Sequence, residues 1–500
     1  MRDKLFPWQI LKVDHRLGGE FTSLAVDSEI KREASMNLLR RKKIEVMTAS
    51  SGDQQPQLKK VLTTTDLVLL GLGAMVGTGI FVVTGLGAER AGPALGVSFL
   101  LAACACALAA LCYSEFASMI PVAGSGYTYS YATLGEIFAW IVGWSLIAEY
   151  GLATAAVSVG WSGYFQSLLG GLGIHIPTLL TAAPGTSGSE HTLFNLPAFA
   201  IMMAITTILS LGIRESKRFN NLLVMVKVAV ILMVVIVGIW YVKPQNYHPF
   251  MPFGVSGVIS GAALAFFAFI GFDAVSSSAE EVAEPQRSLP VGLLGSLGIC
   301  AVLYASVALV STGIVPYAQF AGVDDPIATV IAHTGVHLLF YLVNVAAILG
   351  MISVILVMAY GLTRLVFAMS RDGLLPPWLS RVNQRQIPVA STWTLGTLSA
   401  LIAGLVPLGT LAELINMGTL MAFILMSIAV PVLRQRRPDL RRSFKMPAPL
   451  ILGPLSVVIC LVLAFSLART TWIAFLAWMA IGLVFYFLYA RHHAHRENLE

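Results

Sequence analysis

The residues with the clearest capacity to bind a ligand are Gly77, Thr78 and Gly79, which interrupt an apolar stretch that begins near Thr65. Lipid offers no hydrogen bonds, so a backbone that unwinds in mid-membrane must be buried in protein or line a cavity. Free amides and half-helix ends at that depth form a binding site for a small zwitterion or ion. The same glycines could instead mark a close contact between two helices, and this segment alone leaves both interpretations open.

A second apolar segment, residues 257–279, is interrupted by a glycine and an acid, at Gly271 and Asp273. The two interrupted segments are the first and the sixth of the predicted spans. If spans one to five and six to ten form two repeats, the interruptions occupy corresponding positions, as expected for a transporter site at a repeat interface. This pairing favours the binding-site interpretation of the first interruption.

Lys227 lies about a third of the way into another apolar segment, residues 220–241. A lysine in hydrocarbon is costly and normally marks a transport pathway or a specific partner. Because desolvation disfavours the charged form, a buried lysine can exchange a proton near neutral pH. The alternative is that the side chain extends to the nearby membrane surface, where Lys217 and Arg218 lie.

Several acids also fall inside apolar segments. Glu149 is interpreted as a structural acid or as a residue that shapes the charge of a pocket. Asp273 is a candidate for contacting a substrate amine or for fixing the unwound backbone beside it. Glu115 is expected to form an ion pair near a span end. Glu413 and Asn416 are expected to have structural or gating roles.

The composition identifies a membrane protein, because 57% of the residues are hydrophobic and only 12% are charged, whereas about a quarter are charged in soluble domains. The sequence predicts an all-α polytopic protein with about twelve spans of the length that a bilayer requires. These are residues 66–86, 93–119, 134–164, 196–212, 220–241, 257–279, 290–313, 338–362, 391–406, 410–433, 450–468 and 472–490.

The net charge of +6 reflects membrane topology rather than nucleic-acid binding. With an even number of spans, the Lys and Arg clusters all fall on one side, and only Arg90, Lys243 and Arg469 lie in loops on the other. This asymmetry predicts that both termini are cytoplasmic and that the lipid bilayer is a partner. Residues 1–60 are predicted to be a largely disordered cytoplasmic tail, and residues 491–500 a short one.

The N-terminal stretch admits other interpretations. Met36 could be an alternative start. Residues 30–47 could form a basic amphipathic helix on the membrane surface.

No enzymatic motif is present, because the sequence lacks a phosphate-binding loop, an HExxH helix and a nucleophile elbow. The five cysteines do not have the spacing of metal ligands, so neither a cofactor nor a metal is predicted. The absence of a nucleotide site argues against a primary pump and favours a secondary transporter or a channel.

The motifs themselves carry a family resemblance. Six segments resemble the amino acid–polyamine–organocation superfamily. They are GAMVGTGIF at 73–81, AGPA at 91–94, YSEFASMIPVAGSGYTYSYATLGE at 113–136, FFAFIGFDAVSSSAEEV at 266–282, PQR at 285–287 and SRDGLLPPWL at 370–379. Within it, they are most similar to bacterial members of the cationic amino acid transporter branch. The resemblance runs from about residue 58 to 490, and the first 35 residues lie outside it.

The resemblance implies a fold of two inverted five-helix repeats, as in the bacterial leucine transporter, plus two extra helices. Within a transporter domain at 61–490, repeat one covers about 66–241, repeat two about 257–433, and the last two spans about 450–490.

The resemblance also implies a substrate site made largely of backbone groups. Amides around Thr78, Gly79 and Ile80, beside Gly77, would bind the substrate carboxylate. Carbonyls near Met75 and around Phe267, Ala268 and Ile270 would bind its ammonium group. Lys227 matches the lysine that replaces a sodium ion in proton-coupled relatives, and Met358 would border the side-chain pocket.

We therefore expect a proton-coupled amino acid symporter of the cell membrane, with alanine-like substrates ranked ahead of arginine or lysine because Met358 would crowd a long side chain. The first alternative is an amino acid exchanger in which Lys227 stays charged. The second is a non-transporting amino acid sensor, supported only by the N-terminal tail. The sequence leaves open an oligomer or a small membrane subunit as a partner.

Overall fold

The computed structural model describes residues 40–41, 62–120, 125–186, 191–212, 217–277, 279, 282, 284–323 and 325–494. In this part of the chain the regular secondary structure consists of helices and one isolated bridge between Leu62 and Val282, and turns and loops connect the helices. Most of the predicted N-terminal tail, including Met36, lies outside the described residues, as does the C-terminal end from residue 495.

Seven helical segments of the described chain are long and apolar enough to cross a membrane. They are α5–α6 (Val83–Met119), α8 (Glu136–Gly171), the segment Asn220–Tyr241 within α10 (Lys217–Gly238) and η3 (Ile239–Tyr241), α13 (Pro285–Ile314), α15 (His337–Arg371), α17 (Leu408–Arg436) and α19–α20 (Arg469–His493). The expectation of a polytopic all-helical membrane protein is thereby confirmed.

Five shorter apolar helices accompany them: α3 (Thr64–Met75), α9 (Leu196–Ser210), α11–η5 (Gly254–Phe269), α16 (Val389–Leu405) and α18 (Pro449–Phe465). Each of the predicted spans overlaps one of the long or short helices. Because a straight span needs about 20 residues, the count of twelve crossings and the repeat remain predictions.

The first predicted span is interrupted, as expected at Gly77–Gly79. Residues 66–86 fall in three helices, α3, α4 (Thr78–Phe81) and α5 (Val83–Ala91), the last of which continues beyond the expected end of the span. The chain then turns at Gly92, whose φ of 65° suits glycine, and continues through η1 (Gly92–Ala94) into α6 (Leu95–Met119).

A capping box fixes the start of α3. The amide of Thr63 donates to the Asp66 carboxylate at 2.8 Å, and the Thr63 hydroxyl accepts from the Asp66 amide. This reciprocal arrangement satisfies two amides that a helix start leaves without partners. The other carboxylate oxygen of Asp66 accepts from the Asn221 side chain at 2.9 Å, which ties α3 to α10.

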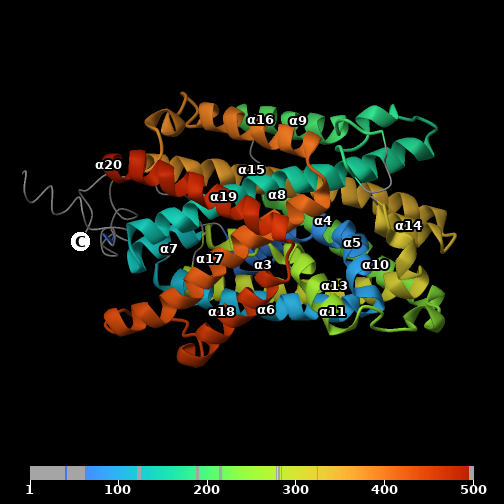
Figure 1. The fold of residues 1–500 in the computed structure, drawn as a ribbon, viewed down its shortest axis with the longest axis horizontal. Coiled ribbons are helices and arrows are strands. Elements are labelled where there is room, and N and C mark those ends of the chain that lie inside the picture. Colours follow the sequence, from blue (N-terminus) through green and yellow to red (C-terminus); the bar gives the residue numbers. More distant parts are fainter. Residues whose placement is uncertain are drawn as a thin grey trace, which may run out of the picture. The chain divides into compact units, whose positions relative to one another are not determined.

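Long helices surround α3 on several sides. It contacts α10, α13 and α15, while α13 also packs along α6, and α15 and α17 pack along α8. Figure 1 shows α9 and α16 side by side, and the two helices contact each other. Small residues permit the close packing of α3: a Cβ at Gly71 would meet Ser296, and one at Gly73 would meet Val224.

The expected ion pair of Glu115 is present at the end of α6. Arg434 donates to both carboxylate oxygens, from Nε at 2.9 Å and from Nη2 at 2.6 Å. The amide of Met446 donates to the same carboxylate at 2.8 Å. Glu115 therefore joins the ends of α6 and α17 to the loop that leads into α18.

Glu115→Gln should lower the free energy of unfolding by about 1–3 kcal/mol, because a bidentate charged contact and a buried backbone partner are weakened together. Thermal unfolding in detergent measures this as a lower midpoint. Asp439→Asn is the control, since Asp439 forms its ion pair with Arg437 at the surface and should change little. Equal midpoints for all three proteins would contradict the assignment.

Candidate functional site

The first predicted break is present, and it lies between α3 and α4. Helix α3 ends at Met75, and α4 begins at Thr78. The carbonyl of Gly77 accepts from the amides of Ile80 and Phe81 at 3.2 and 3.1 Å. In the described chain, the amides of Gly77, Thr78 and Gly79 donate to no backbone carbonyl. They are therefore available to a ligand.

The second predicted break is also present. Helix α11 (Gly254–Ala265) tightens into the 3₁₀ turn η5 (Phe266–Phe269), and Ile270 is extended. Gly271 has a φ of 107°, a conformation that glycine adopts without strain. The short helix α12 (Ala274–Ser277) follows.

The two breaks touch each other. A Cβ built at Gly79 would overlap the Cα atom of Ala268, so the absence of a side chain at Gly79 allows the two backbones to approach. The packing interpretation of the glycines and the binding-site interpretation thus apply together, because the close contact joins the two unwound segments.

A small cavity lies beside this junction. Its volume is about 20 Å³, and all of the residues that line it are buried. The lining carries no charged side chain. It consists of Ala74, Met75, Gly77, Thr78, Gly79, Ala153, Val157, Phe267, Ile270, Val354 and Met358.

Most of the predicted substrate-binding residues line this cavity, namely Met75, Gly77, Thr78, Gly79, Phe267, Ile270 and Met358. Ile80, Ala268 and Asp273 do not. The sequence interpretation missed Ala153 and Val157 of α8 and Val354 of α15. These are ordinary apolar residues. The only sequence signal for them is a spacing of four residues, between Ala153 and Val157 and between Val354 and Met358, which places each pair on one face of a helix.

Lys227 lies behind the first break. Its side chain is only 1% exposed, and Nζ donates to the carbonyls of Gly73 at 3.3 Å and Val76 at 3.2 Å, and to the Ser353 hydroxyl at 2.9 Å. The alternative in which it extends to the membrane surface is therefore wrong. A positive charge at the C-terminal end of α3 is favourable because carbonyl dipoles converge there.

Gly350 of α15 makes room for this lysine. A Cβ at Gly350 would lie 3.0 Å from Cε of Lys227. The lysine thus connects α10, α3 and α15.

Asp273 lies at the second break, outside the cavity lining. Its carboxylate accepts from the Tyr150 hydroxyl at 2.8 Å, and its carbonyl accepts from the amide and the hydroxyl of Ser276 at 2.9 and 2.6 Å. This geometry favours the interpretation in which Asp273 fixes the unwound backbone.

Glu149 lies on α8, next to Tyr150, and is 1% exposed. Its Oε2 atom has no hydrogen-bond partner in the described chain, and its polar neighbours include Asp273 and Thr419. These neighbours place Glu149 in a polar cluster at the second break, and it is not among the residues that line the cavity.

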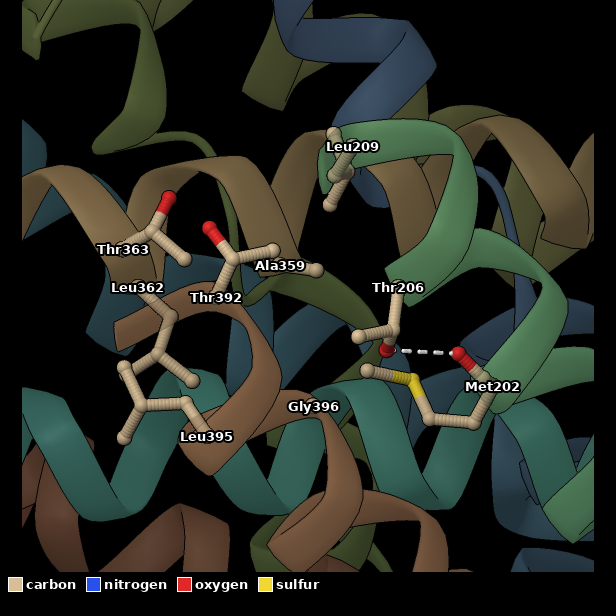
Figure 2. Close-up of a pocket in the computed structure, with 9 residues that line it drawn as sticks. All are labelled: Met202, Thr206, Leu209, Ala359, Leu362, Thr363, Thr392, Leu395 and Gly396. Atoms are coloured by element: carbon tan, nitrogen blue, oxygen red, sulfur yellow. Dashed lines mark hydrogen bonds between the residues drawn. The ribbon is translucent and has the colours of Figure 1, made fainter. Parts of the chain in front are cut away.

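A second cavity lies between α9, α15 and α16 (Figure 2), away from both breaks. Its three threonine hydroxyls donate within their own chain segments: Thr206 to Met202, Thr363 to Tyr360, and Thr392 to Pro388. With these donors already used and the other lining side chains apolar, this cavity offers little to a polar ligand.

An ion pair connects the helix that follows the first break to α17. Arg90, at the end of α5, donates to Glu413 of α17 at 2.6 Å, and Glu413 also accepts from the Thr471 hydroxyl of α19 at 2.6 Å. Nearby, the Asn416 side chain donates to the carbonyl of Ala263 in α11 at 2.7 Å. These contacts hold α5 and α11, which lead into and out of the breaks, against α17.

Comparison with known proteins identifies the family to which this chain is similar. The model of the amino acid permease family matches residues 62–488. The chain is 55% identical over 460 residues to a branched-chain amino acid permease, BcaP, of Bacillus subtilis, covering 92% of this chain and 98% of that protein. It is 50% identical to the methylthioribose transporter of the same organism, covering 92% and 99%. A vacuolar cationic amino acid transporter of Arabidopsis thaliana is 37% identical, covering 81% and 68%.

The chain therefore belongs to the amino acid permease family, within the amino acid–polyamine–organocation superfamily. It is a multi-pass membrane protein of the amino acid transporter class rather than an enzyme.

Gly79→Ala should separate the two breaks, because its methyl group would overlap the backbone of Ala268. Overpacking of this kind costs about 1–3 kcal/mol, and we expect both the unfolding midpoint and substrate binding to fall. Gly298→Ala is the control, because nothing lies within 4 Å of that position in α13. A Gly79→Ala protein with normal stability and binding would show that the breaks do not depend on this contact.

Proposed function

We propose that this protein is a secondary transporter that carries a small neutral amino acid across the cell membrane together with a proton. The observation that carries the proposal is the cavity at the junction of two broken helices, together with the backbone amides and carbonyls of these breaks that have no backbone partner in the described chain. Such a site is complementary to the two ends of a zwitterion.

We assign the head groups of the substrate to backbone groups of the two breaks. The amides of Gly77, Thr78 and Gly79, at the start of α4, would bind the carboxylate, whereas the predicted amide of Ile80 already donates to Gly77. In the described chain, the carbonyls of Met75, Ala268 and Ile270 accept no backbone hydrogen bond. These carbonyls would bind the ammonium group.

The side-chain pocket favours a neutral substrate. Ala153, Val157, Val354 and Met358 border the cavity, and the lining provides no acid for a lysine or arginine side chain. A relative named as a branched-chain amino acid permease supports an aliphatic substrate. The relative named as a methylthioribose transporter shows that this level of identity does not fix the substrate, so the test must include that compound.

Proton coupling would act through Lys227. In its charged form it holds the carbonyls of Gly73 and Val76 and so stabilises the C-terminal end of α3. Loss of its proton would remove the charge that favours this geometry and loosen the first break. Protonation and substrate binding would then be linked, because both depend on the same backbone segment.

The arrangement in the membrane is also part of the proposal. We place both termini in the cytoplasm and count the long and short apolar helices as twelve spans. Spans one to five and six to ten would form two inverted repeats, with the two breaks in equivalent positions. The transporter domain would cover residues 61–490.

Lys227→Met should abolish proton-driven accumulation while leaving the protein folded, because methionine fills the space but carries no proton. The measurement is uptake of labelled alanine and valine into proteoliposomes with and without a pH gradient. Lys243→Met, at an exposed lysine outside the helices, is the control. Gradient-driven uptake by Lys227→Met at the wild-type level would refute the coupling role. Uptake that never responds to a pH gradient, in any variant, would favour the exchanger.

Met358→Ser should admit longer and more polar side chains. One or two methylenes of steric conflict are worth about 1–3 kcal/mol, or roughly 10–200-fold in selectivity. Competition against labelled alanine by valine, leucine, arginine, lysine and methylthioribose measures the change, with Leu349→Ala on the exposed face of α15 as the control. A wild-type protein that already prefers arginine would reverse the proposed substrate ranking.

A further inference from the structure

We infer that Arg40 is an intramolecular latch: it fills a site at the corner between α7 (Ser125–Thr133) and α8, and it thereby holds α7 against the helix that follows the second break. The inference uses Arg40 alone from the N-terminal region. It rests on the proposed transport function for its purpose, but not for its test.

The site is built around Glu136, the first residue of α8, which is fully buried. Arg40 donates from Nη2 to Oε1 of Glu136 at 2.9 Å. In return, the amide of Glu136 donates to the carbonyl of Arg40 at 2.8 Å. Tyr486 donates to Oε1 at 2.9 Å, and Tyr131 to Oε2 at 3.2 Å. The carboxylate therefore joins Arg40, α7, α8 and the π-helix η9 (Tyr486–Ala490).

Charge makes Arg40 necessary to this cluster. A buried carboxylate needs an opposite charge, and removing one partner of such a pair is strongly destabilising. In the described chain, Arg40 is the cation paired with Glu136, and the two tyrosines supply only neutral hydroxyls.

The contact is also suited to release. Arg40 is 5% exposed, yet its Nε and Nη1 atoms have no hydrogen-bond partner in the described chain. Because two of its nitrogen atoms make no hydrogen bond in the closed state, release of Arg40 costs less than release of a fully bonded guanidinium would. This incomplete satisfaction fits a latch that opens better than a permanent structural staple.

Helix α7 connects the latch to the second break. Three alternate tyrosines of α7 contact different parts of the molecule. Tyr131 donates to Glu136, and Tyr127 donates to Asp372 at the end of α15 at 2.6 Å. Tyr129 has Asp273 and Ser276 as polar neighbours. Helix α7 also contacts α12 and α17. A shift of α7 would therefore change contacts directly beside the second break.

The consequence for transport follows from the closed cavity. Every lining residue is buried, so substrate enters or leaves only after some helices move. Helix α12 contacts α7, and Arg40 binds the Glu136 carboxylate that also accepts from Tyr131 of α7. Under this inference, release of Arg40 loosens α7 and lets α12 move away from the cavity more readily. A chain that starts at Met36 keeps the latch, whereas a chain that starts after residue 41 loses it.

The test measures how accessible α7 is, without relying on transport. Ala132→Cys places a reporter thiol at a buried position of α7, in a background in which the exposed Cys104 is replaced by alanine. The rate at which a membrane-impermeant maleimide alkylates this thiol in open membranes is measured for the chain with no further change and for its Arg40→Ala, Arg40→Lys and Arg41→Ala variants. It is also measured for a chain that starts at Met36 and for one that lacks residues 1–41. The same background with Ala132 retained gives the baseline.

We expect labelling of the reporter thiol to rise about tenfold or more in Arg40→Ala and in the chain lacking residues 1–41, because a buried ion pair is lost. Arg40→Lys should be intermediate, and Arg41→Ala and the Met36 chain should match the wild type. Equal labelling in all correctly inserted variants would overturn the latch.

Misfolding is separated from release by a rescue. A peptide with the sequence of residues 36–45, added to the chain lacking residues 1–41, should restore protection of the reporter thiol, whereas the same peptide with alanine in place of Arg40 should not. No protection by either peptide, in a truncated protein that still inserts, would contradict a specific arginine site. Uptake measured in parallel tests the proposed transport function separately, since labelling can follow the prediction even if uptake fails.

Discussion

The contact of Lys227 with the carbonyls of Gly73 and Val76 is the interaction on which the central architecture depends. A helix that ends inside a membrane leaves carbonyl groups that lipid cannot satisfy. The lysine satisfies two of them and places a positive charge where the dipole of α3 is negative. The break can then exist at the centre of the bundle, and the amides on its other side remain available to a ligand.

The second break is held by different means. Gly271 permits the turn, and the carbonyl of Asp273 closes it through Ser276. The two breaks then approach each other at Gly79 and Ala268, and the cavity lies beside this approach. Ion pairs farther away, Arg90 with Glu413 and Arg40 with Glu136, join the surrounding helices. The molecule thus combines a junction rich in unused backbone groups with charged contacts that fix the helices around it.

The features predictable from the sequence were those that break a strong pattern. Glycines at 77 and 79, an acid at 273 and a lysine at 227 all stand out in apolar segments, and the structure places them at or behind the breaks. Ala153, Val157 and Val354 were missed because apolar residues on apolar helices carry no signal of which face meets a cavity. The partner of Glu136 was missed for another reason: Arg40 is 96 residues away in sequence and belongs to a basic run that is typical of a surface tail.

The central claim is that the amino acid binds with its backbone at the junction of the two breaks. An experimental structure of the protein with bound alanine or valine tests this most directly. The account predicts the substrate carboxylate within about 3 Å of the amides of Gly77, Thr78 and Gly79, and the ammonium group facing the carbonyls of Met75, Ala268 and Ile270. Substrate bound elsewhere, such as in the cavity between α9, α15 and α16, would contradict it.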